Sequence, residues 1–188
     1  MELVQPIRDK TKIEAMKKVL RGQSLRDYVL FILGINSGLR ISDLLALDVQ
    51  DVADEKGKPR DRLVVTEQKT GKRKEFPLSA AVQKAIREYL MSRVSRPQEP
   101  LFPSRKAGYR LQRRQAYEIL SVAAKSVGID ESIGTHTLRK TFGYHAYHAG
   151  YDVTRIQNAL NHTSPGVTLR YIGITQDDMD EMYMALDL

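Results

Sequence analysis

The chain has 188 residues, of which 41% are hydrophobic and 28% are charged. This size and composition predict one folded domain with an apolar core. The sequence shows no apolar run near the roughly 20 residues of a membrane span, and we see no secretory signal after Met1. It contains no cysteine, which excludes disulfides and thiolate metal sites and leads us to expect a cytoplasmic protein.

The charge is positive and unevenly distributed. The net charge is +7, but residues 175–188 carry five acidic and no basic side chains and contribute −5, which leaves +12 for residues 1–174. A basic body with an acidic tail indicates a polyanionic partner such as nucleic acid. From charge alone, a basic protein without such a partner is equally compatible.

Three helices are predicted at the start of the chain. Apolar residues recur at helical spacing over 10–21 and form one face. A more apolar segment follows at 25–36, and Ser37-Gly38 interrupts it before a third helical stretch at 41–47. The face of the first helix, which Gly22 ends, consists of Ile13, Met16, Val19 and Leu20.

A β-hairpin is predicted next. After a polar loop at 48–60, Leu63-Val64-Val65 reads as a strand. Residues 73–77 return as its partner, so the hairpin covers 62–77. The turn between the strands contains Gly71 at a position that needs positive φ.

Helices return in the second half of the chain. Ser79, Asp152 and Ser164 each precede a helical stretch and are typical N-cap residues. The predicted helices are 80–93, 111–127, 137–149, 153–160 and 165–172. The predicted inward positions are Ala116, Ile119, Leu120 and Ala123 on one helix, and Leu138, Phe142, His145 and Ala149 on another. The fold class is therefore mainly α with a small antiparallel β-sheet (α+β), with one domain at 1–174 and an acidic tail helix at 175–188.

Six side chains together predict a phosphodiester-cleaving site. Such a reaction needs cations for the non-bridging oxygens, a nucleophile in line with the leaving oxygen, and an acid that protonates it. Arginine forks match phosphate geometry. None of the groups requires a metal, so we expect neither a metal nor another cofactor. The candidates are Arg40, Lys69, His136, Arg139, His162 and Tyr171.

Each candidate has an ordinary alternative explanation. Arg40 alone reads as a surface arginine, Lys69 as a solvated turn residue, and Tyr171, late in a short helix, as a core residue. His136 and Arg139 share a helical face, but that spacing alone is a weak motif. His162 follows a predicted left-handed cap and is expected to be exposed at a turn. The set gains its meaning from its combination and order.

In that combination the chain resembles the catalytic domain of the tyrosine recombinases, or phage integrases. Four motifs, spread over nearly all of the chain, carry the resemblance. They are Ser37 to Leu47, the turn Lys69-Thr70-Gly71-Lys72, His136 to Phe142, and Leu160 to Pro165 continuing to Tyr171.

The resemblance implies a role for each group. Arg40 and Arg139 would hold the scissile phosphate, His162 would donate to it, and His136 would assist Tyr171. Tyr171 would attack the phosphorus and form a 3′-phosphotyrosyl intermediate. Lys69 would protonate the departing 5′ oxygen, which gives a free 5′-hydroxyl. We choose Lys69 over Lys72 for this role. Asp43 would support Arg40 or nearby backbone.

Double-stranded DNA is the expected partner. Two basic stretches are predicted to contact it, one around the hairpin turn and one at the start of the 111–127 helix. A solvated charged face is the alternative for both. The predicted contacts are Lys72, Arg73, Lys74, Arg105, Lys106, Arg110, Arg113 and Arg114.

The chain departs from the family pattern in two ways. Asn161 stands where glycine is more frequent, a change that a left-handed cap tolerates. The amino-terminal DNA-binding domain of most relatives is missing, so we expect either a stand-alone catalytic domain or a truncated fragment. A dimer or tetramer on nucleoid DNA is expected, with 175–188 packing in cis or in trans. A regulator that binds DNA without turnover and a type IB topoisomerase-like enzyme are the alternatives.

Overall fold

The computed structural model describes residues 4–106, 108–134, 136–174, 180 and 183–186. Within these ranges the chain is mainly helical with a two-stranded antiparallel sheet, which confirms the predicted fold class. The helices are α1 (Lys10–Gln23), α2 (Leu25–Ser37), α3 (Ile41–Leu45), α4 (Val49–Val52), α5 (Ala80–Met91), α6 (Arg113–Ser126), α7 (Thr137–His148), α8 (Val153–Leu160) and α9 (Pro165–Ile172). The strands are β1 (Arg62–Thr66) and β2 (Arg73–Pro77).

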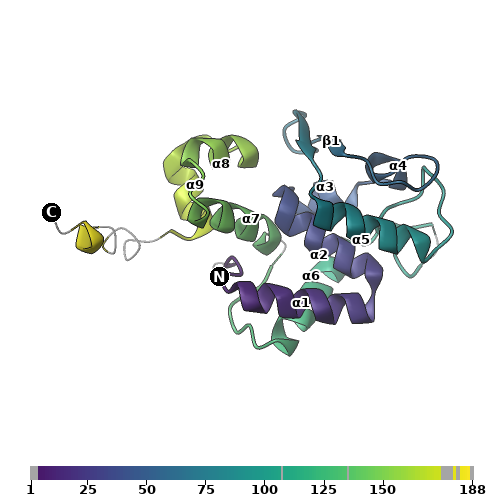
Figure 1. Ribbon diagram of the computed structural model, residues 1–188, viewed down its shortest axis with the longest axis horizontal. Helices are drawn as coiled ribbons and strands as arrows, with labels where there is room; N and C mark the ends of the chain where they lie inside the picture. Colours follow the sequence, from purple (N-terminus) through teal and green to yellow (C-terminus); the bar gives the residue numbers. More distant parts are fainter. Residues whose placement is uncertain (1–3, 107, 135, 175–179, 181–182, 187–188) are drawn as a thin grey trace.

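Helix α2 is the centre of the main core. It packs against α1, α5 and α7, and Figure 1 shows it between α1 and α5. Its sequence explains this position, because five consecutive apolar residues at 29–33 are all buried, so the middle of the helix is covered on every side. The other helices expose a polar side and lie around it.

A smaller apolar cluster holds the last two helices together. Ile156, Leu160 and Ile172 are its buried members. Helices α8 and α9 contact each other and α7, and in Figure 1 the three helices form the part of the molecule on the far side of α2 from α5. Helix α7 thus connects this cluster, and with it α8 and α9, to α2 and the main core.

The hairpin follows the predicted register. Arg62 pairs with Pro77 and Thr66 with Arg73, and Gly71 in the turn has φ of 66°. Leu63 and Val65 point into the core, whereas the alternate residues of β1 are exposed. The hairpin therefore presents its turn and the carboxyl end of β1 next to α3.

Some predicted boundaries were wrong. Helix α1 continues past Gly22 to Gln23, and the predicted loop 48–60 contains α4, because Asp51 accepts the backbone N–H of Asp48 at 2.8 Å and starts a turn. The predicted third helix ends at Leu45 rather than at 47. The predicted helix 80–93 ends at Met91, and the predicted helix 111–127 is shorter at both ends, from Arg113 to Ser126. On α7, Ala149 is exposed beyond the helix end, and Phe142 and His145 are only half-buried.

The acidic tail lies mostly outside the described residues. The predicted helix over 175–188 includes Asp180 and 183–185, which are helical. Tyr183, Met184 and Leu186 are exposed. In the described part of the chain, no helix combines the length and apolar character that crossing a bilayer requires.

Candidate active site

Helices α2 and α7 meet closely at the base of the site. A Cβ at Gly34 would come within 2.5 Å of Leu138, and one at Gly38 would come within 2.6 Å of Phe142. Gly38 also has φ of 62°, the left-handed conformation that ends α2. Because the helices approach so closely, the guanidinium of Arg139 on α7 donates to the Gly38 carbonyl at 2.6 Å. The two glycines thereby set the position of Arg139.

Arg139 joins three helices through one side chain. It is 2% exposed, and it also donates to the carbonyl of Leu160 at the end of α8. Helix carbonyl ends carry partial negative charge and stabilise a cation there. A buried guanidinium fixed at two points is the arrangement expected for a phosphate clamp.

Arg40 precedes α3 and reaches two buried carboxylates. Its Nη1 lies 2.9 Å from Oε1 of Glu67 and 4.0 Å from Oδ2 of Asp43. The other oxygen of Asp43 accepts the backbone N–H of Gln68 at 3.0 Å. Asp43 thus lies near both groups that the sequence suggested, the guanidinium of Arg40 and nearby backbone.

Glu67 is the main counter-ion of the site. It is 1% exposed, and Oε2 accepts from Thr70 at 2.7 Å and from the Asn161 amide at 3.0 Å. Burial raises the pKa of this carboxyl, but the bonds from Thr70, Arg40 and Asn161 outweigh it and bring the pKa to about 2. Glu67 therefore stays ionised and ties α3, the hairpin turn and the end of α8 together.

Tyr171 lies at the junction of α9 with α7. A Cβ at Gly143 would come within 2.6 Å of Ile172, so glycine again permits close helix packing. The hydroxyl of Tyr171 lies 3.2 Å from Nδ1 of His136. The ring of His162 lies 4.8 Å from the Tyr171 ring, at 72° to its plane. Two histidines that are 26 positions apart in the sequence thus flank one phenol.

His162 is half-buried, which corrects the predicted exposure. Asn161 has φ of 49° and ends α8, as the sequence suggested, and this cap turns the chain so that His162 packs against α9. Its Nδ1 lies 3.2 Å from Oγ1 of Thr168, and the same hydroxyl oxygen lies 3.2 Å from the carbonyl of Ser164. The hydroxyl of Thr168 therefore fixes the plane of the His162 ring.

The pKa shifts favour neutral histidines beside a neutral phenol. Burial, followed by the charges of Arg139 and Arg40, lowers the pKa of His162 to about 4. Partial burial and neighbouring cations also lower the pKa of His136. Burial raises the pKa of Tyr171, an effect that Arg139 and Arg40 oppose. A neutral His136 can accept the proton of Tyr171 as the oxygen attacks.

Two of the hairpin lysines face different surroundings. Lys69 is exposed in the turn between β1 and β2. Lys72, also exposed, donates to Oδ1 of Asn161 at 3.1 Å, which connects the turn to the end of α8. Both therefore lie at the rim of the site. Arg73 points to solvent, with Nη2 3.8 Å from Glu75.

Lys74 is half-buried and lies beside the end of α2. Its contact with the DNA backbone, which the sequence suggested, stays a prediction. Its Nζ donates to the carbonyl of Ser37 at 3.3 Å, next to the carbonyl that holds Arg139. Burial is the main cause that lowers its pKa to about 8, and the charge of Arg139 adds to it. Ser37 and Gly38 thus anchor two cations at the end of α2.

Comparison with known proteins agrees with this geometry. The sequence profile described as "Phage integrase family" matches residues 8–177. The chain belongs to the phage integrase family. It is therefore a tyrosine recombinase, an enzyme that breaks and rejoins DNA in site-specific recombination.

Curated relatives differ in how much of their length this tyrosine recombinase covers. It is 45% identical to the "Probable integrase/recombinase YoeC" of Bacillus subtilis, over 97% of both chains. It is 32% identical to "Tyrosine recombinase XerD" of Corynebacterium glutamicum, over 85% of this chain and 52% of that protein. The chain thus spans nearly all of one relative and about half of the other.

Solved structures show the same fold. The XerA recombinase crystal structure matches 100% of this chain and 65% of its own, with a TM-score of 0.78 and 22% identity. The catalytic domain of bacteriophage HP1 integrase matches 90% of this chain and 87% of its own, with a TM-score of 0.61 and 18% identity. At these identities, the structural likeness is evidence for the fold alone.

The basic residues before and at the start of α6 have different surroundings. Arg105 and Lys106 are exposed. Arg114 is exposed too and pairs with Glu118 at 3.0 Å. Arg113 lies near enough to His136 for its charge to lower the histidine pKa, so the start of α6 faces the active site.

Arg110 is held by the protein itself. Its guanidinium donates to the carbonyls of Ala46 and Leu47 at 2.8 and 3.0 Å and to the carboxylate of Asp48 at 2.7 Å. These bonds satisfy carbonyls left free where α3 ends. DNA contact by Arg110 stays a prediction, and it requires these bonds to open.

The sequence analysis missed three buried polar side chains near this site, Glu67, Thr168 and Lys140. In the sequence, Glu67 looks like a solvated residue at the end of a strand. Thr168 looks like an ordinary helix residue, and Lys140 looks like a surface lysine. Thr168 is a polar residue three positions before the candidate nucleophile Tyr171, and Glu67 is a carboxylate two positions before the turn lysine. Only their proximity in the folded chain connects these two residues to the site.

Proposed function

We propose that this tyrosine recombinase cuts and rejoins DNA strands through a 3′-phosphotyrosyl bond, with no metal ion, ATP or other cofactor. The observation that carries the proposal is the 3.2 Å contact between the Tyr171 hydroxyl and Nδ1 of His136. The charges of Arg139 and Arg40 act on the same phenol. A nucleophile, a proton acceptor and two guanidinium groups thus meet around a space beside one phenolic oxygen.

The chemical step follows from these positions. The oxygen of Tyr171 forms a bond to phosphorus, and its proton passes to His136. Arg40 and Arg139 neutralise the non-bridging oxygens as charge accumulates there, and His162 donates to one of them. The bond from phosphorus to the 5′ oxygen breaks, and Lys69 protonates that oxygen.

Rejoining is the reverse of this step. A 5′-hydroxyl from a partner strand attacks the phosphotyrosine and gives its proton to Lys69. Tyr171 leaves, and its proton returns to it from His136. One phosphodiester bond is exchanged for another of equal kind, so no external energy source is required. Integration, excision and inversion are all compatible with this chemistry.

Double-stranded DNA is the proposed substrate and a homo-oligomer the proposed active form. The +12 charge of residues 1–174 supports DNA binding. The solved XerH recombinase is bound to its palindromic difH substrate in a post-cleavage complex, with a TM-score of 0.75 and 20% identity to this chain. We further propose dimers or tetramers on nucleoid DNA in the cytoplasm, joined through residues 175–188. Deleting 175–188 is expected to change the size of the protein–DNA complex in sedimentation, and an unchanged size counts against this role.

The test captures the cleavage site and the intermediate together. A pool of duplexes with randomised sequence and a nick in one strand is incubated with the protein in the presence of a metal chelator. Cleavage near the nick releases a short fragment, so the 5′-hydroxyl diffuses away and the covalent adduct accumulates. Sequencing the captured DNA then defines the site.

Three variants show whether the adduct depends on the proposed residues. Tyr171→Phe is expected to abolish the adduct, whereas Tyr151→Phe, which changes an exposed tyrosine, retains it. Arg139→Ala is expected to slow cleavage by roughly 10²–10³-fold, the cost of a lost oxyanion donor. Binding without any adduct supports a regulator instead, and relaxation of supercoiled DNA without sequence preference supports a topoisomerase.

A further inference from the structure

Lys140 is a buried cation that has no anionic partner in the part of the chain that the structure describes. It is 7% exposed, and among the described residues its ammonium makes no hydrogen bond or ion pair. Burying an ammonium group is costly unless another group compensates for the lost water. The burial lowers the pKa of Lys140. The side chain must therefore find its compensation elsewhere.

The ring of Tyr171 supplies that compensation. Nζ of Lys140 lies over this ring, 5.2 Å from its centroid, which is within cation–π range. The ring of His136 meets the same phenol at 83° and that of His162 at 72°. The nucleophile is thus enclosed by two imidazoles and one ammonium group, which come from α7 and the α8–α9 turn.

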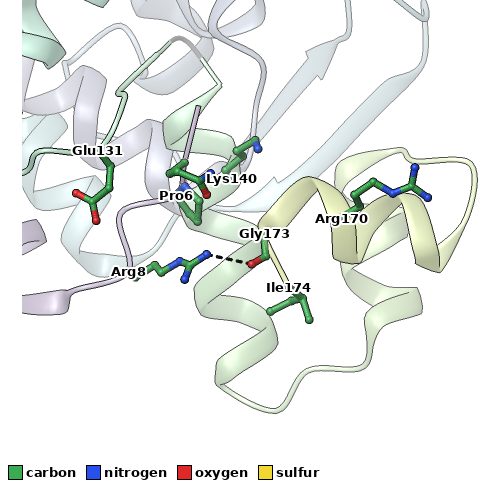
Figure 2. Close-up of a pocket in the computed structure, with 8 residues that line it drawn as sticks. Pro6, Arg8, Glu131, Lys140, Arg170, Gly173 and Ile174 are labelled. Atoms are coloured by element: carbon green, nitrogen blue, oxygen red, sulfur yellow. Dashed lines mark hydrogen bonds between the residues drawn. The ribbon is translucent and has the colours of Figure 1, made fainter. Parts of the chain in front are cut away.

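Lys140 also lines a cavity of about 490 Å³ on the side of α7 that faces the amino-terminal segment (Figure 2). Across this cavity, Arg8 donates to the carbonyl of Gly173 at 3.1 Å, which fixes the end of α9 just after the tyrosine. The carboxylate of Glu131 lines the same cavity but is outside ion-pair distance of Lys140 in the described structure. The ammonium is therefore directed to the phenol and not to the acid.

We propose that Lys140 is a positioning residue for Tyr171, whose ring it holds in the orientation from which the oxygen attacks. The inference rests on the proposed function, in which Tyr171 is the nucleophile. Lys140 follows Arg139 directly on α7. Because they are consecutive on the helix, Arg139 faces the phosphate site and Lys140 faces the ring of Tyr171. Helix α7 alone therefore aligns the phosphate-binding guanidinium with the nucleophile.

The first test observes the ring without DNA. Protein labelled with ¹³C in its tyrosine rings gives a Tyr171 signal in NMR spectra that is identified by its loss in Tyr171→Phe. Lys140→Met keeps the length and apolar stem of the side chain and removes the charge. We expect the Tyr171 signal to move and the ring to flip faster in Lys140→Met, with Lys140→Arg close to wild type. An unmoved Tyr171 signal overturns the proposal.

The second test measures attack. On the DNA captured from the randomised pool, Lys140→Met is expected to slow adduct formation by about 10-fold, the order of a desolvated cation–π contact. The dissociation constant for that DNA stays unchanged, and Lys140→Arg recovers most of the rate. Lys125→Met, on the exposed side of α6, controls for the loss of a positive charge.

The outcomes separate the two proposals. An adduct that forms equally fast in wild type and Lys140→Met overturns the role of Lys140 alone. No adduct from wild type with any duplex in the pool overturns the proposed function. If Lys140→Met proves unstable in thermal unfolding, Lys140→Gln takes its place, and its adduct rate decides by the same criterion.

Discussion

The Oε1 oxygen of Glu67 lies 2.9 Å from Nη1 of Arg40, and both groups are largely shielded from solvent. This pair connects the carboxyl end of β1 to the start of α3. In the proposed function Arg40 binds phosphate. The ion pair holds its guanidinium in place before any ligand binds, which reduces the ordering that binding must supply. The carboxylate also limits the repulsion among the clustered cations of the site.

Glu67→Gln is expected to destabilise the chain in a pH-dependent way. The pKa of Glu67 is about 2 in the folded state and 4.5 in the unfolded reference. A depressed carboxyl pKa contributes stability above pH 4.5, and this stability is lost as pH falls towards 2. At about 1.4 kcal/mol per unit, the loss in the variant at neutral pH is on the order of 3 kcal/mol.

Urea unfolding at pH 7 and pH 3 measures this effect. The gap in unfolding free energy between wild type and Glu67→Gln should be large at pH 7 and much smaller at pH 3. Glu14→Gln breaks an exposed pair with Lys17 and is expected to cost less than about 1 kcal/mol at either pH. A gap for Glu67→Gln that is independent of pH would falsify the assignment of Glu67 as the ionised counter-ion.

Substitutions of Lys69 and of Lys74 are expected to slow cleavage for different reasons, which two substrates can distinguish. If Lys69 protonates the leaving oxygen, Lys69→Met slows cleavage by roughly 10²–10⁴-fold. A substrate with sulfur in place of the leaving 5′ oxygen needs no proton, because a thiol ionises near pH 8.5, and it should restore the rate. Lys74→Met should be slow on both substrates, since Lys74 supports the phosphate site from Ser37.

Lys74 should also set an alkaline limit. With a pKa of about 8, it loses its positive charge above that pH, and phosphate binding weakens. Lys74→Arg keeps its charge and should extend cleavage to higher pH. If the sulfur substrate restores the rate of Lys74→Met but not of Lys69→Met, then Lys74 is the proton donor and Lys69 supports the phosphate site.

Thr168→Val is expected to impair His162 while keeping the shape of the core. The valine retains the volume of a fully buried side chain but cannot hydrogen-bond Nδ1 of the imidazole, 3.2 Å away. Because the pKa of His162 is about 4, the ring is neutral at pH 7, and only the nitrogen that carries the proton can donate to phosphate. Without a hydrogen-bond partner for Nδ1, nothing determines which of the two ring nitrogens of His162 carries the proton.

Single-turnover adduct formation measures the consequence. Thr168→Val should be slower by about 10-fold, the value of one neutral hydrogen bond or slightly more, and Thr168→Ser should be close to wild type. Thr163→Val changes an exposed neighbour and should have no effect. Equal rates for the serine and valine variants at position 168 would show that the hydroxyl has no role.

Local signals predicted the elements, while long-range packing decided the site. Ser79, Asp152 and Ser164 act as the helix caps that their sequence context indicated, because a cap needs only its own next turn. The order of motifs was enough to select Tyr171 and Arg139 as candidates, and their catalytic roles stay a prediction. The ionised Glu67 was not predictable, since its burial depends on α3, the hairpin and α8 meeting at one point. The inward turn of Arg110 depends in the same way on carbonyls that α3 leaves free.

Gly38→Ala tests whether backbone packing positions Arg139. A Cβ at this residue would lie 2.6 Å from the Phe142 ring, and φ of 62° is unfavourable for alanine by about 1–2 kcal/mol. To accommodate both effects α7 must move from α2, which lengthens the 2.6 Å bond between Arg139 and the Gly38 carbonyl. Thermal unfolding should show a lower midpoint, and adduct formation should fall by more than DNA binding does.

Gly22→Ala provides the matched control. Gly22 lies in α1, with no other atom within 4 Å of an added Cβ, so alanine there should raise stability by about 0.5–1 kcal/mol and leave cleavage unchanged. Glycine substitution as such is then separated from the loss of close packing. If Gly38→Ala cleaved DNA at the wild-type rate despite a lowered unfolding midpoint, the position of Arg139 would not depend on the α2–α7 contact, and the fixed guanidinium would have to be explained by its bond to Leu160 alone.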